Sequence, residues 1–416
     1  MTPRAAVVVT GSELTRGGRQ DANGPFLARE LAARGLEPAR IIVVGDRPEE
    51  LEAALREGLQ ADLLVTSGGL GPTHDDRTVE TLARVAGRDV VVDDGLEARI
   101  AQFSRSLAER FRRPYSEFEK GVRKQASLPE GALVLGLAGT APGLVLETDG
   151  CVAIVLPGPP GELRRLWAKA VEAPPVKAIF DRARAPARRI LRFYGVSESA
   201  VARALAEAGG EGEGVEATIC AHDGEIEMLL LGEGEPLAQA LRETLARHLF
   251  AQDERSVSEI VLQACRERGL SLAAAESCTG GLVAARLTSV PGSSEVFRGG
   301  IVAYDDAVKV EQLGVPEEIL AAHGAVSAET AEAMAAGALS AFEVDLAVSV
   351  TGIAGPGGGT PEKPVGLVFL HAQGPDRAKS LEIRFPGDRE AVRRRATAAA
   401  LHLVRRLLAQ SSHEAA

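Results

Sequence analysis

The sequence lacks the features that mark exported and membrane-spanning proteins. It contains only four cysteines, and none stands in CxxC spacing, which argues against a zinc knuckle or a disulfide framework. They are Cys151, Cys220, Cys265 and Cys278. No stretch approaches the ~18 unbroken apolar residues of a spanning helix, and the N-terminus carries no long apolar segment of a signal peptide. We therefore expect a cytoplasmic protein that does not act at a membrane.

The chain also has fewer basic than acidic residues. The chain has 47 Lys and Arg against 58 Asp and Glu, which gives a formal net charge of −11 and a pI near 5.4. A protein that binds nucleic-acid phosphates would need a local basic patch despite this acidic net charge, and the sequence shows no cluster of basic residues of that kind. We therefore expect no direct contact with nucleic acid. The 416 residues themselves predict two to three domains of ~150 residues each.

Short β-rich runs alternate with helical periodicity in the first third of the chain. The pattern predicts strands at 5–10, 41–45 and 62–67 and helices at 26–35, 48–59 and 77–87. Such βαβαβα alternation is typical of a mostly parallel sheet with helices on both faces. Ligands of such sheets bind in the crevice beyond the carboxyl ends of the strands.

The composition and the predicted order of strands and helices change twice after this region. Two prolines and a basic cluster near residue 170 indicate a boundary, and residues 190–250 have the strand, helix, strands, helix order of a small α+β module. Alternation restarts at Ser256. The predicted fold class is therefore α/β, with two α/β domains of mostly parallel sheets joined by a small α+β middle module. The predicted domains are residues 1–169, 170–252 and 253–416.

The stretch LLVTSGGLGPTHDD, residues 63–76, runs from a predicted strand into a glycine-rich loop and a pair of carboxylates. Gly68, Gly69 and Gly71 allow a tight turn with exposed N–H groups beside a helix N-terminus, which suits a phosphate. Asp75 or Asp76 could simply cap the next helix. One aspartate suffices for a cap, however, so the second would be free to bind a divalent cation or a ribose hydroxyl.

Four other turns of this domain carry polar or proline-rich chemistry, namely GSEL (11–14), DANGPFLARELAARG (21–35), GTAPG (139–143) and LPGPPGEL (156–163). Together with TSGGLGPTHDDRT, they resemble the N-terminal domain of the competence/damage-inducible protein family CinA over roughly residues 1–168. The resemblance extends more distantly to the molybdopterin-binding domains of molybdenum-cofactor biosynthesis.

The resemblance implies a metal-dependent ADP-ribose pyrophosphatase that releases AMP and ribose 5-phosphate. Asp75 and Asp76 would be catalytic and would hold a divalent ion such as Mg, Mn or Co. No glutamate-rich helix of the Nudix kind is visible to do this instead. The residues implied in substrate binding are Gly68, Gly69, Gly71, Glu13, Asp21 and Asn23, although a turn or cap role remains an alternative for the last three.

A second cluster of small and polar residues lies in the last domain. AAAESCTGG (273–281) places polar groups and a glycine pair between a strand and a helix start, and SVTGIAGPGGGT (349–360) ends a later strand in a glycine-rich loop. Cys278 is a candidate nucleophile, but no histidine stands nearby as a base, and small buried cysteines are common. Further on, Ser294 stands in a glycine-flanked turn, followed by Tyr304 and Lys309.

These motifs resemble the CinA C-terminal domain over residues 256–410, and the resemblance implies deamidation of nicotinamide mononucleotide without a cofactor. Ser294 would attack the carboxamide, a neutral Lys309 would take its proton, and Tyr304 would relay or orient that proton. Ser277, Ser293 and Cys278 compete for the nucleophile's role, and only the family pattern selects Ser294. The implied pocket residues are Glu276, Ser277, Thr279, Gly280, Thr351 and Gly352. His323 is expected at a helix end.

Two classes of function remain open at this point. The first is a bifunctional enzyme of pyridine-nucleotide recycling, which is chemically coherent because ADP-ribose and nicotinamide mononucleotide both arise from NAD. The second is a non-catalytic nucleotide or pterin binder that acts in competence or recombination. Release of AMP from ADP-ribose would distinguish them. A homodimer is the expected assembly.

Overall fold

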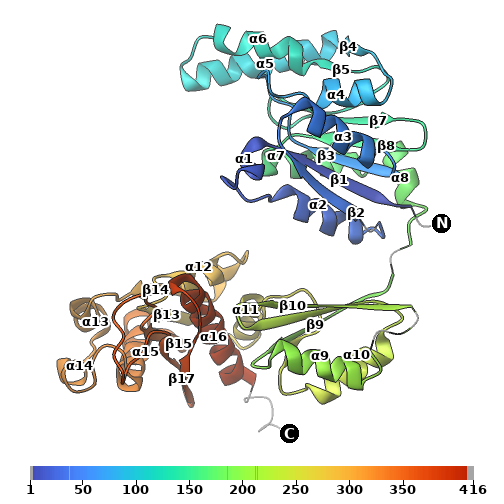
Figure 1. Ribbon diagram of the computed structural model, residues 1–416. Coiled ribbons are helices and arrows are strands. Elements are labelled where there is room, and N and C mark those ends of the chain that lie inside the picture. The colour runs from blue at the N-terminus through green and yellow to red at the C-terminus, as the bar shows by residue number, and fades with distance from the viewer. Residues whose placement is uncertain (1–2, 37, 185, 211, 213, 410–416) are drawn as a thin grey trace. The chain divides into compact units, whose positions relative to one another are not determined.

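The computed structural model describes residues 3–36, 38–184, 186–210, 212 and 214–409, and the chain divides into two compact units (Figure 1). The units are Met1–Pro186 and Ala187–Ala416. Among the described residues, no helix combines the length and the apolar character needed to cross a membrane.

The first unit is built on a six-stranded sheet in the order β2-β1-β3-β8-β7-β6. β2, β1, β3 and β8 run parallel, whereas β7 and β6 add to this core as antiparallel strands. The strands are β1 (Ala5–Thr10), β2 (Pro38–Val44), β3 (Leu63–Ser67), β6 (Leu133–Leu137), β7 (Pro142–Glu147) and β8 (Val152–Leu156). β1 and β3 are buried along their whole length, which explains their unbroken aliphatic runs.

Helices cover both faces of this sheet, as the alternation predicts. α2 (Asn23–Ala32), α7 (Pro160–Ala170) and α8 (Pro174–Phe180) pack on one face, through residues such as Leu27, Leu163 and Val176. α3 (Pro48–Gly58), α4 (Thr78–Val85) and α5 (Asp94–Phe111) pack on the other, through residues such as Leu51 and Leu82. The short α1 (Ser12–Thr15), α6 (Ser116–Gln125) and a two-stranded antiparallel sheet of β4 (Val90–Val92) and β5 (Ser127–Pro129) complete the unit.

The boundary of the first unit lies later than the sequence predicts. A break near residue 170 would leave α8 outside, but Ala173, Val176 and Ile179 are buried in the first unit's core. The prolines of residues 174–175 open α8 instead of a linker, because proline is well accommodated in the first turn of a helix. The first unit therefore extends to Pro186, and the second begins at Ala187.

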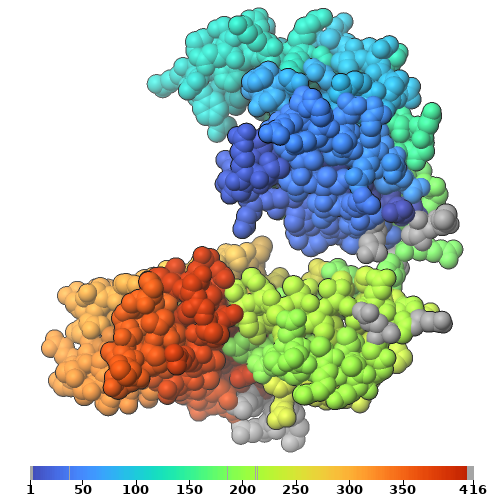
Figure 2. Space-filling view, in the orientation of Figure 1, coloured from blue at the N-terminus to red at the C-terminus, as the bar shows by residue number. Residues whose placement is uncertain are grey.

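The middle module and the last domain together form the second unit. The module is an antiparallel sheet in the order β10-β11-β9-β12, with α9 (Glu198–Glu207) and α10 (Glu235–Thr244) packed on its core. Its strands are β9 (Arg188–Tyr194), β10 (Val215–His222), β11 (Glu225–Gly232) and β12 (Leu249–Ala251). Figure 2 shows the module, in yellow-green, in direct contact with the red C-terminal part of the last domain.

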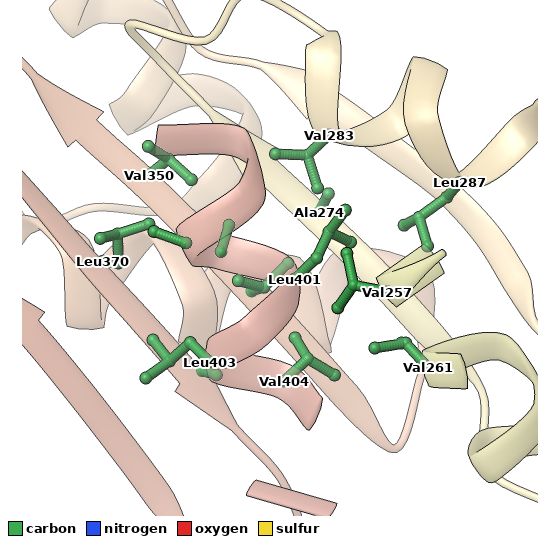
Figure 3. Close-up of a cluster of buried hydrophobic side chains, with 14 of the residues drawn as sticks. Val257, Val261, Ala274, Val283, Leu287, Val350, Leu370, Leu401, Leu403 and Val404 are labelled. Atoms are coloured by element: carbon green, nitrogen blue, oxygen red, sulfur yellow. The ribbon is translucent and has the colours of Figure 1, made fainter. Parts of the chain in front are cut away.

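The last domain has a five-stranded sheet in the order β14-β13-β15-β16-β17. β14 (Phe297–Val302), β13 (Leu272–Glu276) and β15 (Leu346–Gly352) are parallel, and β16 (Leu367–Gln373) and β17 (Ala378–Arg384) are antiparallel. One face packs on α11 (Val257–Glu267), α12 (Leu282–Thr288) and α16 (Arg389–Ala409), where Leu401 and Val404 meet Ala274 and Val350 (Figure 3). The other face packs on α13 (Asp306–Leu313) and α15 (Ala328–Phe342). The predicted α/β class is confirmed, with parallel strands at the centre of both large sheets.

Candidate functional sites

A cavity of about 550 Å³ lies at the carboxyl ends of β1, β3 and β8 in the first unit. All eight residues predicted for this unit line it: Glu13, Asp21, Asn23, Gly68, Gly69, Gly71, Asp75 and Asp76. The sequence reading missed other lining side chains, among them Arg19, Asp46, Gln125, Thr140 and Glu162. Asp46 stands in the turn after β2 and Glu162 in the first turn of the helix after β8, so the rule that placed the loop at 68–76 could have found them.

The glycine loop after β3 owes its shape to two close approaches. Gly68 and Gly69 have φ of +102° and +68°, which side chains rarely adopt. A Cβ atom on Gly69 would lie 2.1 Å from Oγ1 of Thr78, whose hydroxyl donates a hydrogen bond of 2.9 Å to the Gly68 carbonyl. Thr78 thereby fixes the loop against the start of α4.

Asp75 and Asp76 converge on a single residue. The Thr73 hydroxyl lies within hydrogen-bond distance of both carboxylates, and the Thr73 N–H donates to Asp76 Oδ2 at 3.0 Å. The hydrogen bond from Thr73 lowers the pKa of Asp75, so this exposed carboxyl stays ionised. Neither aspartate caps α4, whose N-cap is Arg77 without a side-chain hydrogen bond. The cap alternative is therefore wrong for this pair, and two adjacent carboxylates remain at the mouth of the loop.

Asp21 and Asn23 hold the opposite wall. The Asp21 carboxylate accepts hydrogen bonds from the N–H groups of Asn23 and Gly24 at 2.9 and 3.0 Å, so Asp21 does cap the first turn of α2. The buried Asn23 amide donates to Ser67 Oγ at 2.9 Å and to the Gly158 carbonyl at 2.7 Å. Asn23 therefore ties α2 to the loops after β3 and β8, which makes it a positioning residue of the cavity.

The cavity is strongly acidic. Six carboxylates line it, and Arg19 is the single lysine or arginine among the lining residues. The carboxylates are Glu13, Asp21, Asp46, Asp75, Asp76 and Glu162. Among the described residues, no three Asp, Glu, His or Cys side chains converge as a preformed metal cage. A divalent ion here would be held by Asp75 and Asp76 and by oxygens of the ligand, the arrangement that magnesium commonly adopts with phosphates.

The second site lies where β13, β14 and β15 end side by side. Ser277 follows β13, and its N–H donates to the Val350 carbonyl of β15 at 2.8 Å. Ala303, just before Tyr304, donates to the Glu276 carbonyl at 2.8 Å. Ser277 is 8% exposed, and its hydroxyl has no hydrogen-bond partner in the described part of the chain.

Lys309 reaches the same edge from α13. It is 1% exposed, and its Nζ lies 3.4 Å from the Tyr304 carbonyl oxygen and 3.0 Å from Asp306 Oδ1. The Asp306 contact joins the buried Lys309 amino group to a side chain that is 60% exposed. The neutral form expected of Lys309 stays a prediction.

Ser294 does not reach this edge within the chain. It lies in the 3-10 helix Ser293–Glu295, before the first residue of β14, whereas Tyr304 follows the last. A six-residue strand spans ~20 Å, which separates Ser294 from Tyr304 and Lys309. The predicted pairing of Ser294 with Lys309 is thus corrected: the serine at the carboxyl ends of the strands is Ser277.

Three predicted pocket residues have structural partners instead. The Glu276 carboxylate accepts hydrogen bonds from the N–H groups of Gly281, Val283 and Ala284, at 2.8 to 3.0 Å, and so caps α12. The Thr351 hydroxyl donates to the Ala325 carbonyl at 2.6 Å. Gly352 lies where a Cβ would be 2.7 Å from the Leu367 carbonyl oxygen, so it permits the close pairing of β15 with β16.

Two arginines from the start of α16 reach the second site, and the sequence reading missed both. Arg389 donates to the Tyr304 hydroxyl at 2.7 Å and to the Gly355 carbonyl at 2.8 Å. Arg393 donates to the Thr279 carbonyl at 2.8 Å. Gly280 leaves room for the Arg393 guanidinium, since a Cβ there would lie 3.2 Å from it. The Thr279 hydroxyl is buried without a hydrogen-bond partner among the described residues.

Cys278 and His323, the remaining candidates of the second unit, are poorly suited to a catalytic role. Burial raises the pKa of the Cys278 thiol to about 12, so this cysteine carries almost no thiolate near neutral pH. His323 is the last residue of α14 (Glu317–His323), as predicted, and its ring contacts Glu329 at 3.4 Å.

Comparisons with known proteins agree with this two-part organisation. The chain matches the family described as CinA C-terminal domain over residues 254–408 and the one described as probable molybdopterin binding domain over residues 6–177. A solved structure of the competence/damage inducible protein CihA from Agrobacterium tumefaciens is 40% identical, covers 38% of this chain and 99% of its own, and has a TM-score of 0.36.

Relatives that match over nearly the whole chain identify its family. A CinA-like protein of Mycobacterium tuberculosis (strain H37Ra) is 44% identical over 98% of both chains. Another, from Mycobacterium sp. (strain MCS), is 45% identical over 98% of this chain and 99% of its own. At this identity over nearly the whole length, the chain belongs to the family of CinA-like proteins.

Proposed function

We propose that the protein is a bifunctional hydrolase of pyridine-nucleotide breakdown products. The first unit would hydrolyse ADP-ribose to AMP and ribose 5-phosphate, and the second would deamidate nicotinamide mononucleotide to nicotinic acid mononucleotide and ammonia. The observation that carries the proposal is the presence of two strand-end sites of different chemistry. One is an acidic cavity with a glycine loop, and the other is the sheet edge that carries Ser277, Tyr304 and Lys309.

In the first unit, the acidic lining itself supports metal dependence. Six carboxylates against one arginine would repel a bare diphosphate, so the substrate must arrive with cations. A divalent ion bound by Asp75 and Asp76 would neutralise the phosphates and increase the electrophilicity of phosphorus. The N–H groups of the glycine loop would orient the phosphate oxygens beside the start of α4. Asn23 would keep the α2 wall in register with this loop.

In the second unit, an amidase needs a nucleophile, a group that moves its proton and a stabiliser of negative charge. Ser277 would attack the carboxamide carbon. Lys309, in its neutral form, would take the Ser277 proton, and would then pass that proton to the departing ammonia. Arg389 and Tyr304 are hydrogen-bonded to each other at the exposed side of the site and would hold the substrate's phosphate or ribose.

A product assay on the purified full-length chain tests the proposal. With ADP-ribose and Mg²⁺ we expect AMP, and with nicotinamide mononucleotide we expect ammonia. Binding of either nucleotide without turnover would favour a non-catalytic binder that acts in competence or recombination.

Asp75→Asn and Asp76→Asn should separate the two activities. Each should lower ADP-ribose hydrolysis by at least ~10²-fold, because each removes one of the two carboxylates available to the metal. Deamidation should stay within a few-fold of the wild-type rate. Normal ADP-ribose cleavage by both variants would show that the metal lies elsewhere.

A further inference from the structure

The six carboxylates of the first cavity differ in how they are held. Asp21, Asp46, Asp75 and Asp76 each accept hydrogen bonds from nearby N–H or hydroxyl groups. Glu13 and Glu162 accept none from the described residues. Of these two, Glu13 is exposed and Glu162 is partly buried. Among the described lining residues, Glu162 is therefore the one carboxylate that is partly buried and accepts no hydrogen bond from the protein.

The surroundings of Glu162 leave its carboxylate free on the cavity side. It lies in the first turn of α7, directly after the prolines that end the β8 turn. Gly139, in the facing loop, has no side chain, and a Cβ there would lie 2.4 Å from Glu162 Oε1. Arg165 does not pair with Glu162 but donates to the Ala138 carbonyl at 2.6 Å, which fixes the loop that carries Gly139.

Burial raises the pKa of Glu162 above its ordinary value, and the positive charge of Arg165 counters part of this shift. The facing loop, residues 138–143, carries no charged side chain. The other charged groups that line the cavity are Arg19, Glu13, Asp21, Asp46, Asp75 and Asp76. A carboxylate with a raised pKa is a better proton acceptor near neutral pH than its exposed neighbours.

We propose that Glu162 is the general base of the first site and takes a proton from the water that attacks the diphosphate. This inference rests on the proposed pyrophosphatase function. The water oxygen forms a bond to one phosphorus, and the bond from that phosphorus to the bridging oxygen breaks. The bridging oxygen keeps the electron pair and leaves with the second phosphate. One water proton passes to Glu162 Oε and then to solvent, and the other stays with the product phosphate.

Glu162→Gln tests the role in the full-length chain, because glutamine keeps the shape and cannot accept the proton. With ADP-ribose and Mg²⁺, we expect kcat to fall by ~10²- to 10⁴-fold and KM to stay within a few-fold. The wild-type rate should increase with pH as Glu162 ionises, at a pH above the ordinary pKa of a carboxyl group. This ascending limb of the pH–rate profile should disappear in the variant. Glu162→Asp should keep the limb at a reduced rate. Glu172→Gln, an exposed change just beyond α7, is the matched control and should behave as wild type.

Two further measurements separate this inference from the proposals it rests on. Carboxylate titration by difference infrared spectroscopy, on protein without metal, should lose one group of raised pKa in Glu162→Gln. Calorimetry should show that the variant still binds ADP-ribose. An active wild type whose Glu162→Gln variant keeps both rate and limb overturns the general base alone. A wild type that does not cleave ADP-ribose overturns the pyrophosphatase and the general base together.

Discussion

At the scale of single residues, the two sites differ in how far the sequence determines them. The residues predicted for the first cavity all line it, because each stands in a turn directly after a parallel strand or at the helix start that follows. In the second site, the family pattern implies Ser294, although this residue precedes a strand. Ser277 follows one, and the rule that parallel strands end at the same edge would have favoured it.

Ser277→Ala should therefore remove deamidation, whereas Ser294→Ala should leave it nearly intact. Loss of the nucleophile should cost at least ~10³-fold in kcat, on the order of 4 kcal/mol of barrier. Ammonia release from nicotinamide mononucleotide measures both variants. Cys278→Ala serves as the control, because the buried thiol should contribute little. A dead Ser294 variant beside an active Ser277 variant would return the nucleophile to Ser294, supplied to this edge by another copy of the chain.

Residue roles inside the second site depend on contacts that local sequence does not encode. Glu276 and Thr351 are polar residues in motif positions, and both bond to backbone groups of other segments. Arg389 and Arg393 lie about 110 residues after the AESCTGG motif, and only the fold brings α16 to it. Such long-range pairs need the tertiary arrangement, which hydrophobic periodicity does not give.

At the scale of elements, Glu276 shows how a strand can cap the helix that follows it. Its buried carboxylate accepts three N–H groups at the start of α12, a seven-residue helix with Gly281 at its N-cap. Such a short helix has few hydrogen bonds of its own and depends on its cap.

Glu276→Gln should therefore destabilise the second unit. Hydrogen bonds to a charged acceptor contribute about 1.5–3 kcal/mol each, and the neutral amide should forfeit about 1–3 kcal/mol in total. Urea unfolding followed by circular dichroism should show a lower midpoint for the variant. An unchanged midpoint would mean that α12 is held by its packing and not by this cap.

The elements themselves were largely predictable, and their partners less so. Alternating strands and helices in residues 5–87 follow the sequence periods closely. The antiparallel additions β6, β7, β16 and β17 were not predicted as such, because strand direction depends on which neighbour a strand meets. α8 belongs to the first unit because it packs on that unit's core. The prolines near residue 174 indicate a boundary in the sequence, so this packing could not be predicted.

At the scale of the whole molecule, the second unit is joined by a buried polar seam between the middle module and the last domain. His402 of α16 is fully buried, stacks on Tyr194 of β9 at 3.7 Å between ring centroids, and lies 3.0 Å from Glu225 Oε1 of β11. Arg286 of α12 also reaches Glu225, at 3.3 Å. The seam explains why the module and the last domain form one compact unit.

This seam predicts a loss of stability in mild acid. Burial lowers the pKa of His402 from 6.5 to about 4, so between these values the unfolded chain binds a proton that the folded chain does not. The free energy of unfolding of the second unit should fall as the pH drops from about 6.5 towards 4. Denaturant midpoints measured across this range provide the test.

His402→Gln is the matched comparison for the seam. Burial lowers the pKa of His371 as well, so part of the acid effect should persist in the variant. The difference between wild type and variant isolates His402 and should shrink as the pH falls. A difference that does not change with pH would show that His402 is protonated equally in both states.

The single tryptophan gives the intact chain a reporter of its own. Trp167 is buried in α7, five residues after Glu162, and its indole donates a hydrogen bond of 2.8 Å to Glu30 Oε2. The second unit contains tyrosines but no tryptophan. Intrinsic tryptophan fluorescence therefore observes the first unit selectively, and the unfolding of that unit can be followed in the intact chain without a label or a cut.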